Sequence, residues 1–112
     1  MRVIRGVFFS VIAVLGLLLS GCNQSQETIK IGYVDPLSGP FANVGENGLR
    51  VLRLFVDEIN EQGGVLNGSK FEVVPIDGKA NPQESLIAFR QLADQKVKFI
   101  FQGNSSAVAG AL

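Results

Sequence analysis

Two adjacent serines, Ser105 and Ser106, are the residues best placed to bind a small anion. They come directly before a helix expected over residues 107–112. The first turn of a helix has free backbone amides that favour an anion such as a carboxylate, and the serine hydroxyls add donors. The alternative is that both serines only cap the helix. The first reading predicts a binding site for a carboxylate in this loop.

A second polar loop, residues 35–45, follows the first expected strand. Ser38 offers a hydroxyl donor there. Phe41 offers a ring that either covers an apolar part of a ligand or fills the core of the domain itself. Asn43, with Glu46 three residues later, predicts a capping box at the start of a helix.

The sequence favours binding over catalysis. Asp35 and Asp77 stand near strand ends and would be the one conceivable acid–base pair, but each has a simpler role as a turn former. The chain lacks the glycine-rich phosphate-binding motifs and the G-x-S-x-G elbow. It has no histidine and one cysteine, which excludes histidine triads, histidine metal sites and an internal disulfide within these residues. We therefore expect no enzyme, no metal site and no cofactor.

The elements that position the two loops alternate between strand and helix. Apolar periodicity and turn residues predict strands over 28–34, 71–76 and 97–101, and helices over 43–62, 82–95 and 107–112. On the longer helix the expected apolar stripe is Leu49, Leu52, Phe55, Val56 and Ile59. On the next helix the expected buried side is Leu86, Ile87, Phe89, Leu92 and Ala93. This alternation predicts an α/β fold with a doubly wound parallel sheet.

Pro75 sets the expected order of the strands. Because proline cannot donate a hydrogen bond to a sheet ladder, the second strand belongs at an edge, which gives the order 2-1-3. The direction in which the connections run across the sheet then reverses between strands one and three, and open α/β sheets bind ligands at that switch point. The loops at 35–45 and 102–106 both lie there.

The first 22 residues have the pattern of an export signal. Arg2 and Arg5 precede an apolar run over residues 7–19, which is about 20 Å long as a helix and too short for a ~30 Å hydrocarbon core. A short membrane anchor is the alternative to a signal peptide. Leu19-Ser20-Gly21-Cys22 resembles the bacterial lipobox, which implies cleavage before Cys22 and its lipidation, although a free buried cysteine is the other reading.

The chain divides accordingly into three expected parts. They are a lipoprotein signal peptide at 1–21, a lipidated cysteine with a flexible tether at 22–28, and a ligand-binding lobe at 29–112. The full chain has ten basic and ten acidic residues with no basic patch, which argues against nucleic-acid binding.

From residue 29 to 112 the chain resembles the N-terminal lobe of type I periplasmic binding proteins, in particular the branched-chain amino-acid binding lipoproteins of ABC transporters. The matching stretches are IKIGYVDPLSGPFANVGENG, FVDEINEQGGVLNG, FEVVPID and FIFQGNSSAVAGAL. The resemblance implies two lobes that close on an amino acid-like ligand, delivery to a permease, and an extracytoplasmic, lipid-anchored location. A sensor domain on the same fold is the alternative, and an extracytoplasmic α/β enzyme is a more remote one.

The resemblance also assigns site residues. It places the ligand's carboxylate and ammonium groups at Ser105 and Ser106, with Asn104 and Ala107 nearby, and lines the cleft with the segment from Ser38 to Phe41. The chain has QGNSS where many members have Gly-Pro before the serines, which leaves the ligand class open. We further expect that 29–112 is an incomplete lobe, and that an isolated 23–112 segment is poorly soluble because strand three exposes a bare apolar edge.

Overall fold

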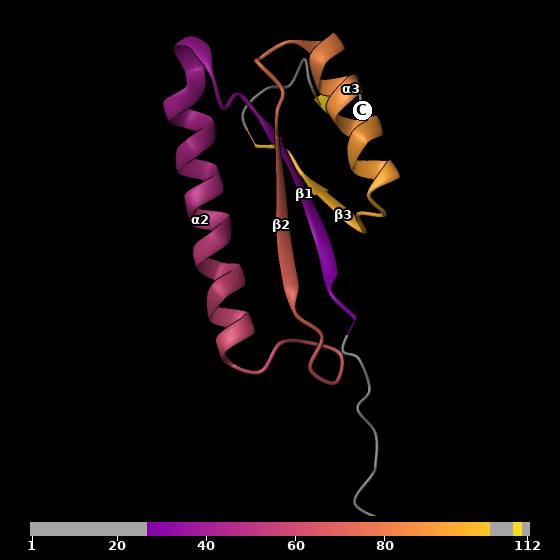
Figure 1. The fold of residues 1–112 in the computed structure, drawn as a ribbon. Coiled ribbons are helices and arrows are strands. Elements are labelled where there is room, and N and C mark those ends of the chain that lie inside the picture. The colour runs from indigo at the N-terminus through magenta and orange to yellow at the C-terminus, as the bar shows by residue number, and fades with distance from the viewer. Residues whose placement is uncertain (1–26, 104–108, 111–112) are drawn as a thin grey trace, which may run out of the picture.

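The computed structural model describes residues 27–103 and 109–110 and contains an alternating α/β fold (Figure 1). Its elements are β1 (Ile29–Asp35), the short 3₁₀ helix η1 (Gly39–Phe41), α2 (Ala42–Glu61), β2 (Phe71–Asp77), α3 (Pro82–Asp94) and β3 (Phe99–Phe101). The strand–helix alternation expected from the sequence is confirmed. The segment expected to be a signal peptide, Cys22 and most of the helix expected over 107–112 lie outside the described residues.

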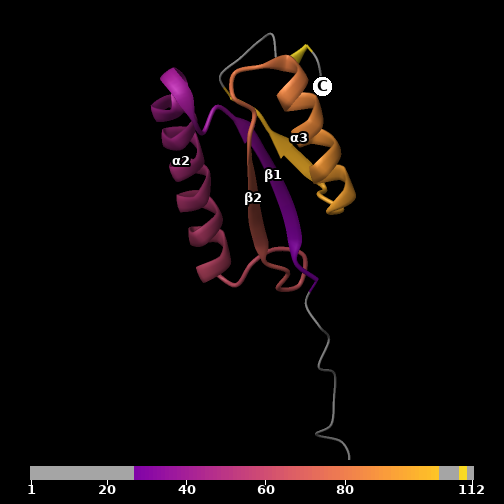
Figure 2. The same cartoon turned by 45° about the horizontal axis from the view of Figure 1, so that its top comes forward.

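The three strands form one parallel sheet in the order β2-β1-β3. β2 carries Pro75 and lies at an edge, as predicted, and Asp35 pairs in register with Asp77. Figures 1 and 2 show α2 on one face of the sheet and α3 on the other. The predicted doubly wound arrangement and its switch point between β1 and β3 are therefore present. Within the described residues, no helix is both long enough and apolar enough to cross a membrane.

The best-buried part of the core lies between the sheet and α3. Val34, Ala88 and Leu92 are almost fully buried there, and partly buried side chains surround them, namely Val74, Ile76, Val97 and Ile100. Gly32 lets the helix approach, because a Cβ at that position would lie 2.6 Å from Leu92 Cδ1. The small residue on β1 thus sets the distance between sheet and helix.

The start of α3 agrees with the sequence, but its buried face was partly mispredicted. Asn81 Oδ1 accepts hydrogen bonds from the amides of Gln83 at 2.8 Å and Glu84 at 3.2 Å, as expected of an N-cap. The buried row is Ser85, Ala88 and Leu92. The expectation was wrong for Ile87, which is 49% exposed, and for Ala93, because both project from other sides of the helix.

Two expectations for α2 were also wrong. Phe41 is the N-cap residue and makes no side-chain cap bond, so the predicted Asn43–Glu46 capping box is absent and Asn43 lies inside the first turn. The reason is η1: its backbone runs straight into α2, and the amide of Ala42 bonds to the carbonyl of Gly39. Phe55 is 58% exposed rather than part of the buried stripe, since Leu49 and Val56 face the sheet.

The link from α2 to β2 is fixed by one side chain. Asn60 Nδ2 donates to the carbonyl of Phe71, and Asn60 Oδ1 accepts from the amide of Phe71, both at 2.8 Å. The helix ends at Glu61, and the chain then turns at Gly63 and Gly64, whose φ values of 109° and 79° are in the region that glycine tolerates best. These contacts set where β2 starts and hence its register against β1.

Candidate functional site

The candidate site lies at the edge of the sheet where β1 and β3 end. The amide of Gly103, just after β3, donates to Asp35 Oδ2 at the end of β1 over 3.3 Å. These residues are 68 positions apart in the chain. The structure thus brings the start of the loop after β3 to the end of β1, as the predicted switch point requires.

Asp35 is the centre of a buried hydrogen-bond group. It is 2% exposed, and the Tyr33 hydroxyl lies 2.7 Å from its Oδ2 and 2.8 Å from the carbonyl oxygen of Gly45 in α2. Burial raises the pKa of Tyr33 far above its usual value, and the hydrogen bond and charge of Asp35 raise it further. The phenol therefore keeps its proton and remains a donor at physiological pH.

Asp77, at the end of β2, holds the loop that follows β1. Its Oδ1 accepts the amides of Leu37 and Lys79, each at 2.8 Å. Burial acts to raise the pKa of Asp77, but the Ser38 hydroxyl, the two amides and the charge of Lys79 together outweigh it and lower the pKa below its usual value. The bond to the amide two residues on is the turn-forming role expected for Asp77.

The structure places two of the predicted ligand-binding residues, Ser38 and Phe41. Ser38 is exposed, and its side chain lies near enough to Asp77 to help lower the pKa of that carboxyl. Phe41 is 59% exposed at the start of α2, so it does not fill the core of the domain. The other predicted residues lie outside the described residues and stay predictions, namely Asn104, Ser105, Ser106, Ala107 and the lipidation site Cys22.

Sequence reasoning missed the pairing of Tyr33 with Asp35. The signal was present, because residues two apart in a strand point to the same face. Asp35 was treated as a turn former, whereas the structure buries its carboxylate under α2. Among the described residues, no group of three or more histidine, cysteine, aspartate or glutamate side chains is arranged to hold a metal ion.

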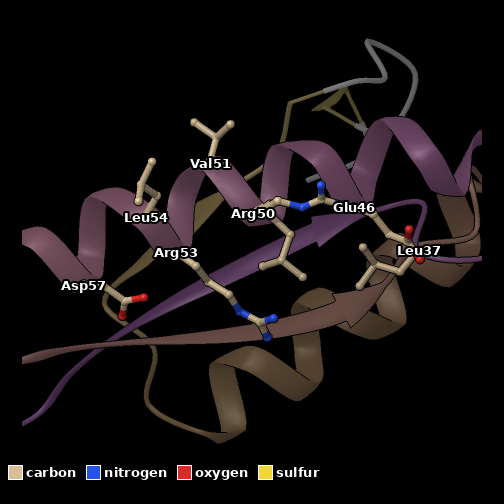
Figure 3. A pocket seen from close by; sticks show the side chains of 8 residues that line it. Leu37, Glu46, Arg50, Val51, Arg53, Leu54 and Asp57 are labelled. Carbon is tan, nitrogen blue, oxygen red and sulfur yellow. The ribbon is translucent and has the colours of Figure 1, made fainter.

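A separate hollow of ≈ 750 Å³ runs along α2 (Figure 3). Apart from Leu37, its lining side chains come from α2. Figure 3 shows charged and aliphatic side chains mixed along it, including Arg50, Arg53 and Leu54. Ser38 and Phe41, the two predicted ligand-binding residues that the structure describes, are not among its lining residues, although Leu37 from the same loop is.

Comparison with known proteins gives a consistent result. The sequence pattern of a family described as periplasmic binding protein matches residues 28–112. The Leu/Ile/Val-binding protein homolog 7 of Brucella melitensis is 38% identical over 94 residues, which are 84% of this chain and 23% of that protein. The chain thus spans about a quarter of the length of the curated relatives that it matches.

Solved structures agree in fold. The branched-chain amino acid transporter substrate binding protein of Streptococcus pneumoniae, in complex with isoleucine, has a TM-score of 0.68 and 32% identity, and the match covers 76% of this chain and 24% of that one. A fatty acid ABC transporter substrate-binding protein from Thermomonospora curvata has a TM-score of 0.67 and 30% identity over 76% of this chain and 21% of that one.

Proposed function

This chain belongs to the periplasmic binding protein family, and on that premise we propose that it supplies the N-terminal lobe of a solute-binding protein that delivers its ligand to an ABC importer. The fold is that of type I periplasmic binding proteins of branched-chain amino acid transporters. The observation that carries the proposal is the contact between Asp35 and Gly103, which joins the loops after β1 and β3 at the switch point.

The proposed ligand is a small molecule with a carboxylate and an aliphatic part, such as a branched-chain amino acid. Isoleucine occupies the Streptococcus pneumoniae relative, and the Thermomonospora curvata relative is named for fatty acids, which also combine a carboxylate with an aliphatic chain. In this proposal Ser105 and Ser106 hold the carboxylate, with Asn104 and Ala107 beside them. Ser38 contributes a hydroxyl and Phe41 an exposed ring from the opposite loop.

The proposal includes no chemical change to the ligand. The relatives are solute-binding proteins. Both strand-end carboxylates already accept hydrogen bonds from the protein itself, Asp35 from Tyr33 and Asp77 from Leu37. Their geometry supports a structural use of both groups rather than acid–base catalysis.

Calorimetric titration of the complete protein with L-isoleucine, L-valine and a fatty acid tests the proposal. We expect at least one of them to bind, and we expect the double substitution Ser105→Ala/Ser106→Ala to weaken binding by about 1–3 kcal/mol. Ser69→Ala, in the turn before β2 at the opposite end of the sheet, is the matched control and should bind normally. If the double variant bound with unchanged affinity, the two serines would act only as helix caps.

We also propose that Cys22 carries a lipid anchor that keeps the protein outside the cytoplasm at a bacterial membrane. The family supports an extracytoplasmic location. The support for the anchor is the Leu19-Ser20-Gly21-Cys22 pattern directly after the apolar run. Cys22→Ser should leave the signal uncut or shift the protein out of the membrane fraction. Normal processing and membrane association of that variant would rule the anchor out.

A further inference from the structure

The carboxylate of Asp35 occupies an unusual place for a charged group. It ends the central strand, it is 2% exposed, and α2 covers it. A buried carboxylate is costly unless hydrogen bonds replace its lost hydration. Here Tyr33 and the Gly103 amide supply hydrogen bonds to one oxygen, Oδ2. The contacts that offset this cost thus involve the backbone just before residues 104–107.

The Tyr33 hydroxyl ties the same group to α2. It has one hydrogen and two acceptors within reach, Asp35 Oδ2 at 2.7 Å and the Gly45 carbonyl at 2.8 Å. Its raised pKa keeps this hydrogen in place. A single network therefore links the first turns of α2, the end of β1 and the backbone after β3.

Two glycines allow the main chain to approach this network. A Cβ on Gly45 would lie 1.9 Å from the carbonyl oxygen of Pro36, and a Cβ on Gly103 would lie 3.2 Å from Asp35 Oδ2. A side chain at position 45 would therefore clash with the backbone, and one at position 103 would crowd the Asp35 carboxylate. The absence of side chains at Gly45 and Gly103 therefore allows the backbone on both sides of Asp35 to lie close to it.

We propose that Tyr33 and Asp35 are positioning residues that hold the Gly103 backbone in place for ligand binding by the loop after β3. They act through Gly103 and do not themselves touch the ligand. This inference rests on the proposed function, because it assigns ligand contact to the residues that follow Gly103. It goes beyond that function in naming the buried pair that sets where the loop begins.

The test uses the complete protein with three variants and L-isoleucine as probe. Asp35→Ala removes the acceptor, Asp35→Asn keeps one oxygen acceptor, and Tyr33→Phe removes only the hydroxyl. Asp94→Ala, exposed at the end of α3, is the matched control. Two readouts are measured for each, the dissociation constant of isoleucine and the exchange rate of the Gly103 amide by nuclear magnetic resonance.

We expect Asp35→Ala to weaken isoleucine binding about tenfold and to speed exchange of the Gly103 amide, because its acceptor is lost. Asp35→Asn should recover most of both effects, and Tyr33→Phe should show a smaller loss of the same kind. Asp94→Ala should change neither. This pattern would separate positioning from a general loss of stability.

The inference is overturned if Asp35→Ala lowers the melting temperature but leaves both the isoleucine affinity and the Gly103 exchange rate unchanged. Failure of the proposed function looks different. A parent protein that binds none of isoleucine, valine or a fatty acid contradicts the ligand class. Faster Gly103 exchange in Asp35→Ala would then still support the link between Asp35 and the backbone after β3.

Discussion

At the scale of single residues, the side chain of Asn60 connects the end of α2 to the start of β2. Its amide group both donates to and accepts from the main chain of Phe71. Lys70 adds a bond from its Nζ to the carbonyl of Asn60. The start of β2 is therefore attached to the last turn of α2 by side-chain and main-chain bonds together.

Asn60→Ala should lower the free energy of unfolding by about 1–3 kcal/mol, because it leaves the amide and carbonyl of Phe71 without their partners. Chemical denaturation of the parent and the variant measures the difference. Asn47→Ala is the matched control, since Asn47 is exposed on the same helix and alanine favours the helix slightly. Equal losses in both variants would show that the Asn60 bonds to Phe71 do not stabilise the fold.

Asp77 gives a prediction for the dependence of stability on pH. Its pKa is lowered in the folded protein from the usual 3.8, so the unfolded chain takes up the proton first as the pH falls. The stabilisation by ionised Asp77 is therefore fully present above about pH 5 and is lost as the pH falls through 3.8 towards the folded pKa.

Asp77→Asn removes this titration while keeping one oxygen for the amides of Leu37 and Lys79. The stability difference between parent and variant should be constant above about pH 5 and shrink below it. Unfolding measured between pH 2.5 and 7 checks this. Asp57→Asn, exposed on α2, should keep the acid dependence of the parent. A difference that does not change with pH would contradict the assigned role of the Asp77 charge.

At the scale of the elements, the two helices begin in different ways. Asn81 caps α3 with its side chain, whereas α2 continues from η1 and needs no side-chain cap. Substituting each asparagine with alanine therefore gives an internal comparison. Asn81→Ala should cost about 1 kcal/mol, and Asn43→Ala should cost nothing or stabilise slightly, because Asn43 lies inside the first turn.

Thermal unfolding of the two variants beside the parent protein decides the point. The melting temperature should fall for Asn81→Ala alone. A comparable fall for Asn43→Ala would support the capping box that the sequence predicted and would place the start of α2 two residues later.

Strand order was predictable because one residue decided it. Pro75 excludes β2 from the middle of a sheet, and the tendency of consecutive strands to lie side by side then places β1 next to β2. Helix bounds were predictable to within one residue at each end, because Gly63, Asn81 and Pro82 give strong local signals. Apolar periodicity was less decisive. The expected stripe on α2 was too wide, because it included Phe55, which points about 100° away from Val56 on the helix.

The meeting of the chain after β1 with the chain after β3 was predictable, but the contacts made there were not. Its position follows from topology alone. The bond from the Leu37 amide to Asp77 joins residues 40 positions apart, and the bond from Gly103 to Asp35 joins residues 68 positions apart. Such long-range pairs leave no local pattern in a single sequence. They become visible when the strands are placed in register.

At the scale of the whole molecule, much apolar surface of the described chain is open. Phe99 and Phe101 of β3 are 60% and 56% exposed, and Val51 and Leu54 of α2 are 53% and 67% exposed. β3 pairs only with β1 among the described strands, so one of its edges carries free backbone groups. An open edge with large apolar side chains promotes pairing with another chain.

We therefore expect a polypeptide of residues 23–112 alone to self-associate. The substitution Phe99→Thr/Phe101→Thr should reduce this, because threonine keeps strand propensity while removing the large apolar rings. Val51→Ser/Leu54→Ser removes apolar surface from α2 and should help much less if the strand edge drives association. Size-exclusion chromatography with light scattering distinguishes these outcomes. A parent segment that is monomeric and melts cooperatively would contradict the expectation. If Val51→Ser/Leu54→Ser reduced self-association equally, the open face of α2 would contribute to it as much as the edge of β3.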